Sequence, residues 1–106
     1  MGWKNRKIEY IKKENIKTGW KIMNKYSLEL KKLIDSNKNN LNLYLILCQI
    51  NGKFYSELKS NKLSFNDKKY YNVWNSIFNR MLKVSNNRNE VIFNINQLYY
   101  ISNKKI

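Results

Sequence analysis

Basic and amide side chains form two clusters that could contact nucleic acid. The first cluster follows one side of residues 66–82 and comprises Lys68, Lys69, Asn72, Asn75, Asn79 and Arg80. The second surrounds an Asn-rich link and comprises Lys83, Asn86, Asn87, Arg88 and Asn89. Arginine and asparagine can make paired hydrogen bonds to base edges, and lysine neutralises phosphates. The clusters therefore predict a DNA-binding surface, to which three further lysines could add phosphate contacts: Lys12, Lys13 and Lys17. The alternative for each residue is ordinary solvated surface.

The overall charge favours the same kind of partner. Lys and Arg number 21 and Asp and Glu number 7 in 106 residues, so the net charge is +14. A protein this basic attracts polyanions, namely nucleic acid, an anionic membrane or an acidic protein. The lysines are spread through the chain instead of lining one long amphipathic face, which disfavours a membrane-surface helix. Double-stranded DNA is therefore the expected partner.

The composition excludes most kinds of catalytic site. With no histidine and one cysteine, the chain can hold no internal disulfide, no Cys/His zinc cluster and no His-dependent triad. Its seven acidic residues show no pair at the spacing used for metal binding or acid–base work, and its three glycines form no phosphate loop. A tyrosine nucleophile is formally open, but nicking relaxases usually also need a histidine-bound metal. We therefore expect a non-enzymatic protein without metal or cofactor.

Length and hydropathy predict a single cytoplasmic domain. A chain of 106 residues is long enough for one core and too short for two. The longest apolar run, residues 43–48, is far below the ~20 residues that cross a bilayer. The first residues contain no apolar signal stretch, which favours the cytoplasm. We expect residues 102–106 to form a flexible tail.

The first half of the chain predicts a β-hairpin followed by two helices. Apolar and polar residues alternate at both ends of residues 6–24, and Thr18-Gly19 would interrupt the alternative, a helix. Residues 25–36 carry an apolar stripe at helical spacing. Residues 41–50 are apolar almost all round, which favours a buried helix over a strand, with Cys48 in the core and Asn51-Gly52 at its end.

The second half predicts one more helix and a β-wing. Residues 53–62 are ambiguous, and residues 63–65 could form a short strand. Residues 66–82 predict a helix, because their apolar residues recur at i, i+3, i+4 and i+7. Strands at residues 81–85 and 90–95 would then be joined by the Asn-rich link, which can adopt the positive φ that a hairpin tip requires.

From Tyr26 onward this order of elements resembles a winged helix-turn-helix domain, with residues 66–82 as the recognition helix. Residues 16–22 resemble the lead-in strand of winged-helix plasmid replication proteins of low-GC Gram-positive bacteria. Residues 91–100 resemble their ending, with Gln97 where that ending usually has proline. The interval before the wing has room for one helix, where the standard domain has two. A small basic protein truncated in this way is similar to conjugation accessory proteins of clostridial plasmids.

The resemblance implies a fold and a role. The fold is α+β, a winged helix-turn-helix with an N-terminal β-hairpin over residues 1–24 and a C-terminal β-wing. The role is that of a homodimer that binds double-stranded DNA at an origin of transfer, with a relaxase or other transfer proteins as further partners. Because one helix is missing, we expect the wing, with Arg88 at its tip, to read bases more than the helix does. The alternatives are a plasmid replication or transcription regulator, and a basic inhibitor or adaptor that covers a partner's nucleic-acid-binding site.

Overall fold

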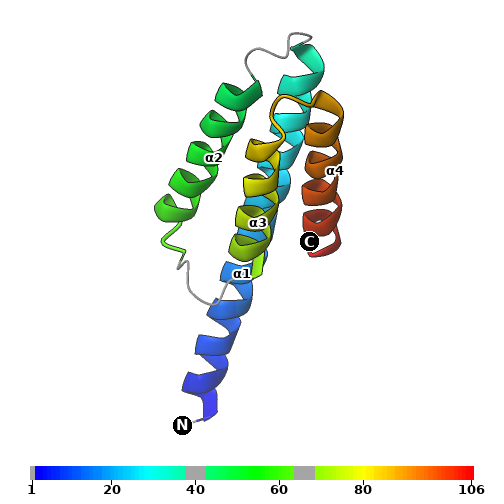
Figure 1. Ribbon diagram of the computed structural model, residues 1–106. Coiled ribbons are helices and arrows are strands. Elements are labelled where there is room, and N and C mark those ends of the chain that lie inside the picture. Colours follow the sequence, from blue (N-terminus) through cyan, green and yellow to red (C-terminus); the bar gives the residue numbers. More distant parts are fainter. Residues whose placement is uncertain (1, 38–42, 64–68) are drawn as a thin grey trace.

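The computed structural model describes residues 2–37, 43–63 and 69–106, with side chains from Asn15 onward. Four helices run alternately up and down: α1 (Gly2–Ser36), α2 (Leu43–Ser60), α3 (Lys69–Lys83) and α4 (Arg88–Lys104) (Figure 1). Helix α1 packs against the other three and extends well past them at its N-terminal end, so the molecule measures 58 × 23 × 21 Å. No described helix is both long and apolar enough to cross a lipid bilayer.

A row of aromatic rings occupies the core between α2 and α3. The Trp74 ring stacks on Phe54 of α2, with centroids 3.9 Å apart, and on Phe78, with centroids 4.9 Å apart. The indole Nε1 of Trp74 donates a hydrogen bond to Asn51 Oδ1 at 2.9 Å. Because the ring is fully buried, this bond satisfies a donor that water cannot reach. The helix predicted for residues 66–82 is thus confirmed as α3 from Lys69 onward, while residues 66–68 lie outside the described part of the chain. Its apolar stripe is the buried face.

The predicted N-terminal β-hairpin is wrong, because the whole segment belongs to α1. Trp20 and Ile22 are both buried, since α1 has neighbours on several sides and buries more than one narrow stripe. Gly19 does not interrupt this helix. A Cβ at that position would lie 2.3 Å from the Tyr70 ring, so the missing side chain lets the α3 ring pack against α1.

The two helices predicted next exist but have other limits. Residues 25–36 form only the last third of α1. The helix predicted for residues 41–50 appears as α2 from Leu43 onward, with residues 41 and 42 outside the described part. It continues through Asn51-Gly52 to Ser60 because Phe54 and Leu58 extend its buried stripe. It is not buried all round, and Cys48 is exposed instead of lying in the core. Of the short strand expected at residues 63–65, Leu63 is buried outside any element, and residues 64 and 65 lie outside the described part.

The predicted β-wing is also wrong. The segment expected to form it contains the end of α3, a turn and the start of α4. Helix α4 forms because its buried residues repeat at helical spacing: Val91, Asn94, Ile95, Leu98 and Ser102. The α+β winged helix-turn-helix is therefore corrected to an all-helical fold over the described residues.

Residues 102–106, expected to form a flexible tail, begin within α4 and contact α1. Helix α4 reaches Lys104, and the buried Ser102 hydroxyl donates to Leu98 O at 2.7 Å. The same hydroxyl accepts a hydrogen bond from Asn24 Nδ2 of α1 at 3.2 Å. The Lys105 ammonium lies over the Trp20 ring, 5.8 Å from its centroid. These contacts fix the orientation of α4 relative to α1.

Candidate nucleic-acid interface

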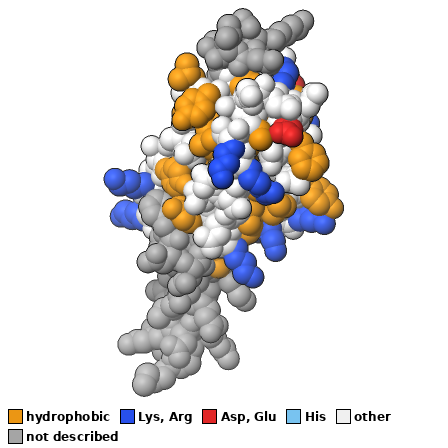
Figure 2. All heavy atoms as spheres, viewed as in Figure 1, with side chains coloured by type: hydrophobic (Ala, Val, Ile, Leu, Met, Phe, Trp, Pro, Cys, Tyr) orange, Lys and Arg blue, Asp and Glu red, His pale blue; other side chains and the backbone are white. Residues whose placement is uncertain are grey.

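The outer face of α3 is the exposed surface that best matches the sequence-based prediction. Its exposed side chains are Lys69, Asn72, Asn75, Ser76, Asn79, Arg80 and Lys83. They contribute three positive charges and no negative one. Figure 2 shows this face, where blue and white side chains cover the surface over α3 and orange ones gather along α4. The structure thus brings together six of the expected contact residues on one helix: Lys69, Asn72, Asn75, Asn79, Arg80 and Lys83.

The buried side of α3 holds this face in place. The Trp74 stack and its bond to Asn51 fix the helix against α2. On the outer side, Tyr55 of α2 donates from its hydroxyl to Asn75 Oδ1 at 3.3 Å. A tyrosine hydroxyl is protonated at neutral pH and can donate, and burial, with a smaller contribution from Tyr71, raises the pKa of Tyr55 further. The face is therefore presented by a helix that its neighbours hold in position.

A groove between α3 and α4 borders this face. Its lining comprises Arg80, Lys83, Val84, Glu90, Phe93 and Asn94. Glu90 is the single acidic residue of this lining, so the groove has a net positive charge. An anionic backbone that follows α3 could therefore extend toward α4.

Ion pairs between described residues lie elsewhere, across α1 and α2. Lys25 Nζ contacts Glu57 Oε1 at 2.6 Å, and Lys53 Nζ contacts Glu29 Oε1 at 3.0 Å. The hydrogen bond that the Lys25 ammonium donates to Glu57 raises the pKa of Lys25 above its ordinary value. Glu57 and Glu29 thus form ion pairs on the α1–α2 side of the bundle, away from the α3 face.

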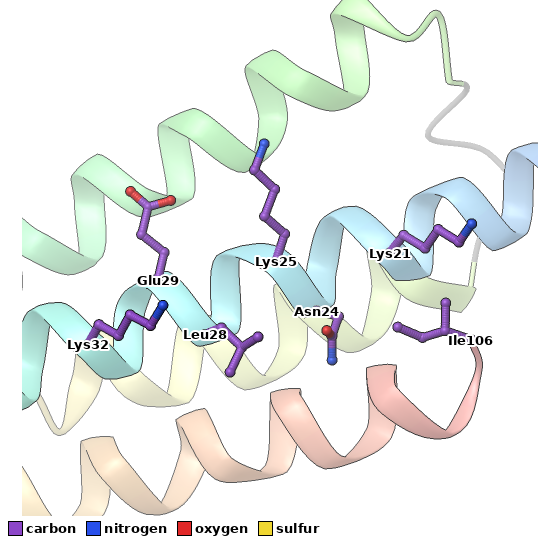
Figure 3. A pocket seen from close by; sticks show the side chains of 7 residues that line it. All are labelled: Lys21, Asn24, Lys25, Leu28, Glu29, Lys32 and Ile106. Atoms are coloured by element: carbon purple, nitrogen blue, oxygen red, sulfur yellow. The ribbon is translucent and has the colours of Figure 1, made fainter.

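A second basic surface lies on the opposite side of the bundle. Figure 3 shows a groove along α1 with α3 behind it, lined by Lys21, Asn24, Lys25, Leu28, Glu29, Lys32 and Ile106. Lys17 is exposed one turn before Lys21. It therefore does not join the α3 face, although the sequence suggested one surface. Lys68 lies outside the described residues, as do the side chains of Lys12 and Lys13.

Arg88 and Asn87 occupy helix ends instead of the tip of a wing, which corrects their expected position. The Arg88 guanidinium donates to the backbone carbonyl oxygens of Ile34 and Asn37, at the C-terminal end of α1. Asn87 caps α4, because its Oδ1 accepts a hydrogen bond from Glu90 N at 3.3 Å. Both side chains therefore have structural partners.

Asn86 and Asn89 remain exposed beside these caps. The predicted contact residues did not include two exposed rings on α4, Phe93 and Tyr100. Helical numbering from Val91 and Leu98 places both rings outward, but the strand predicted for residues 90–95 placed Phe93 on the same face as Val91 and Ile95.

The described residues contain no group of three His, Cys, Asp or Glu side chains able to hold a metal ion. Comparison of the chain with models of protein families, with curated proteins and with solved structures found no match.

Proposed function

We propose that the protein binds double-stranded DNA through the outer face of α3. The observation that carries this proposal is one exposed helix face with three cationic and three asparagine side chains and no acidic one. It belongs to a chain of net charge +14. Lys69 and Lys83 lie at the two ends of the helix, where they can contact phosphates. Asn72, Asn79 and Arg80 lie between them and carry the groups that bond base edges.

The dimensions of α3 support this role. Fifteen residues give a helix about 22 Å long. An α-helix is about 10–12 Å across with its side chains, which fits the major groove, about 12 Å wide. Because its core side is already packed, α3 loses little conformational freedom on binding, which favours affinity.

The predicted role at an origin of transfer is no longer supported by the sequence pattern that suggested it. The resemblance that implied it rested on a lead-in strand and a wing. The first segment lies within α1, and the second contains the end of α3, a turn and the start of α4. We therefore base the proposal on the surface of α3 alone and do not extend it to conjugation.

We further propose that the DNA-binding form is a homodimer, because one helix face offers few base contacts. The apolar residues of the predicted hairpin, Tyr10, Trp20 and Ile22, are the interface candidates that the sequence suggests. Trp20 and Ile22 do not supply an interface, since both are buried within the chain, and the side chain of Tyr10 lies outside the described part. Sedimentation velocity with and without DNA tests this. A monomer under both conditions at high micromolar concentration contradicts it.

The salt dependence of DNA affinity tests the α3 face. Each phosphate contact contributes about −0.9 to the slope of log K against log salt. The triple variant Lys69→Ala/Arg80→Ala/Lys83→Ala should therefore reduce the steepness of the slope by about 2 to 3 if these cations contact phosphates. The matched control Lys17→Ala/Lys21→Ala/Lys32→Ala removes the same charge from α1 and should leave more of the slope. An equal loss in both variants refutes the assignment to α3.

Base recognition needs a separate measurement. Duplexes enriched from a random pool provide the preferred site, and scrambled duplexes provide the comparison. Asn72→Ala should weaken binding to the preferred site by about five- to 150-fold, equivalent to 1–3 kcal/mol, and leave scrambled duplexes unaffected. If no duplex binds at all, double-stranded DNA is not the partner, and the basic surface of α3 fits an inhibitor or adaptor better.

A further inference from the structure

Two exposed aromatic rings lie on the outer side of α4. The Phe93 side chain is 62% exposed and that of Tyr100 is 61% exposed. They are seven residues apart, so they lie on the same side of the helix about 10.5 Å apart along its axis. Asn96 is exposed between them. We call Phe93, Asn96 and Tyr100 the α4 ledge. Its rings contribute nothing evident to the core, which buries the opposite side of α4.

Cationic side chains surround the α4 ledge. Phe93 lines the groove that contains Arg80 and Lys83 of α3, and it also lines a second groove with Lys31 of α1. The second groove continues past Gln97 and Tyr99 to Tyr100. Lys104 places its ammonium over the Tyr100 ring, 4.3 Å from the centroid. Glu90 is the one acidic residue in the lining of either groove.

This combination of rings and cations matches one class of ligand. Nucleic acid without a paired strand offers flat bases that stack on aromatic rings, and phosphates that cations neutralise. Duplex DNA does not fit the rings, because its bases are stacked inside the helix. An acidic protein would use the cations, but it would not need two separately exposed rings.

We propose, building on the proposed function, that the α4 ledge binds single-stranded nucleic acid by stacking unpaired bases on Phe93 and Tyr100. Stacked bases are about 3.4 Å apart along one strand, so rings 10.5 Å apart would hold bases about three steps from each other. The groove shared by Phe93, Arg80 and Lys83 joins the ledge to the α3 face. The preferred ligand is therefore a duplex with a single-stranded extension, in which α3 binds the duplex and α4 binds the extension.

Fluorescence anisotropy with three DNA probes tests the ledge. The probes are a blunt duplex, an oligothymidylate and the same duplex with an oligothymidylate overhang. For the double variant Phe93→Ser/Tyr100→Ser we expect at least a fivefold loss per ring on the oligothymidylate and the overhang probe. Blunt-duplex affinity should stay within twofold, about 0.4 kcal/mol. Phe93→Trp/Tyr100→Phe should restore single-strand binding, because it restores two flat rings.

The matched control is Tyr44→Ser/Leu45→Ser, which removes an exposed pair from α2 whose side chains are 53% and 60% exposed. It should bind all three probes like the unaltered protein. The proposal is overturned if Phe93→Ser/Tyr100→Ser and the control bind oligothymidylate with equal affinity. It is also overturned if Phe93→Ser/Tyr100→Ser loses self-association but keeps its affinity for single strands. If the unaltered protein binds blunt duplex but no single strand, the ledge proposal fails and the α3 proposal stands. If it binds none of the probes, both fail.

Discussion

Arg88 joins the start of α4 to the end of α1, and its removal should destabilise the fold. The guanidinium donates to two carbonyl oxygens at the C-terminal end of α1, those of Ile34 and Asn37. Carbonyl groups of a final helical turn have no partner within the helix, and a cation there also interacts favourably with the helix dipole. The Arg88 side chain thus satisfies carbonyl acceptors at the end of α1, and the Arg88 backbone begins α4.

The expected cost follows from these interactions. A hydrogen bond from a charged donor contributes about 1.5–3 kcal/mol, and a partly buried cation at a helix C-terminus up to ~2 kcal/mol. The terms overlap, so Arg88→Ala should lower the free energy of unfolding by about 2–3 kcal/mol. Arg88→Lys keeps the charge but loses the planar fork that reaches two acceptors, so about 1 kcal/mol should be lost.

Urea unfolding followed by far-UV circular dichroism measures these losses. Arg80→Ala is the matched control, because that arginine is exposed on α3 and its loss should change stability by less than about 0.5 kcal/mol. Folded Arg88→Ala should still discriminate preferred from scrambled duplexes. A loss below about 0.5 kcal/mol, or lost discrimination with unchanged stability, refutes this account and returns Arg88 to a base-reading role.

Four further substitutions test the packing, each by urea unfolding. Gly19→Ala should lower stability by about 1–3 kcal/mol, because its Cβ meets the Tyr70 ring. The Cβ of Gly52→Ala meets nothing, so this change should raise stability by about 0.5–1 kcal/mol. A stabilising Gly19→Ala contradicts the close approach of the Tyr70 ring to α1. Tyr70→Phe removes a buried hydroxyl without a hydrogen-bond partner in the described part of the chain, so stability should be unchanged or higher. Burial raises the pKa of that hydroxyl, so above pH ~10 the unfolded state binds fewer protons and wild-type stability should fall more steeply than that of Tyr70→Phe; parallel pH profiles contradict this. Asn51→Ala leaves the buried Trp74 Nε1–H unpaired and should cost about 1–3 kcal/mol; a loss near zero shows that this bond is dispensable.

Helix α3 and its outer face could be predicted from the sequence because the spacing of the apolar residues there fits only a helix. The apolar residues from Tyr70 to Met81 repeat only at helical spacing, so Asn72 and Asn79 must lie opposite the core. The structure places them there, exposed. The exposed face of a single amphipathic helix can therefore be predicted without knowing which elements pack against its buried face.

The segment after α3 has two local solutions, and the sequence-based prediction chose the wrong one. Val91, Phe93 and Ile95 alternate as in a strand, whereas Val91, Ile95 and Leu98 repeat as in a helix. A strand places Phe93 on the same face as Val91 and Ile95, whereas a helix places it on the opposite side. The strand solution places Asn87 at a hairpin tip, although asparagine favours helix N-caps as much as turns, and it caps α4 here.

By itself, the sequence determined the net charge of +14, the lack of histidine and the amphipathic character of α3, because these depend on composition and local spacing. Only the tertiary structure decided that Gly19 lies inside a helix and that Arg88 caps another helix. Gly19 faces the Tyr70 ring of α3, and Arg88 reaches carbonyl groups more than fifty positions earlier in the chain. Such partners are invisible to a local pattern, since they become neighbours only when the four helices pack together.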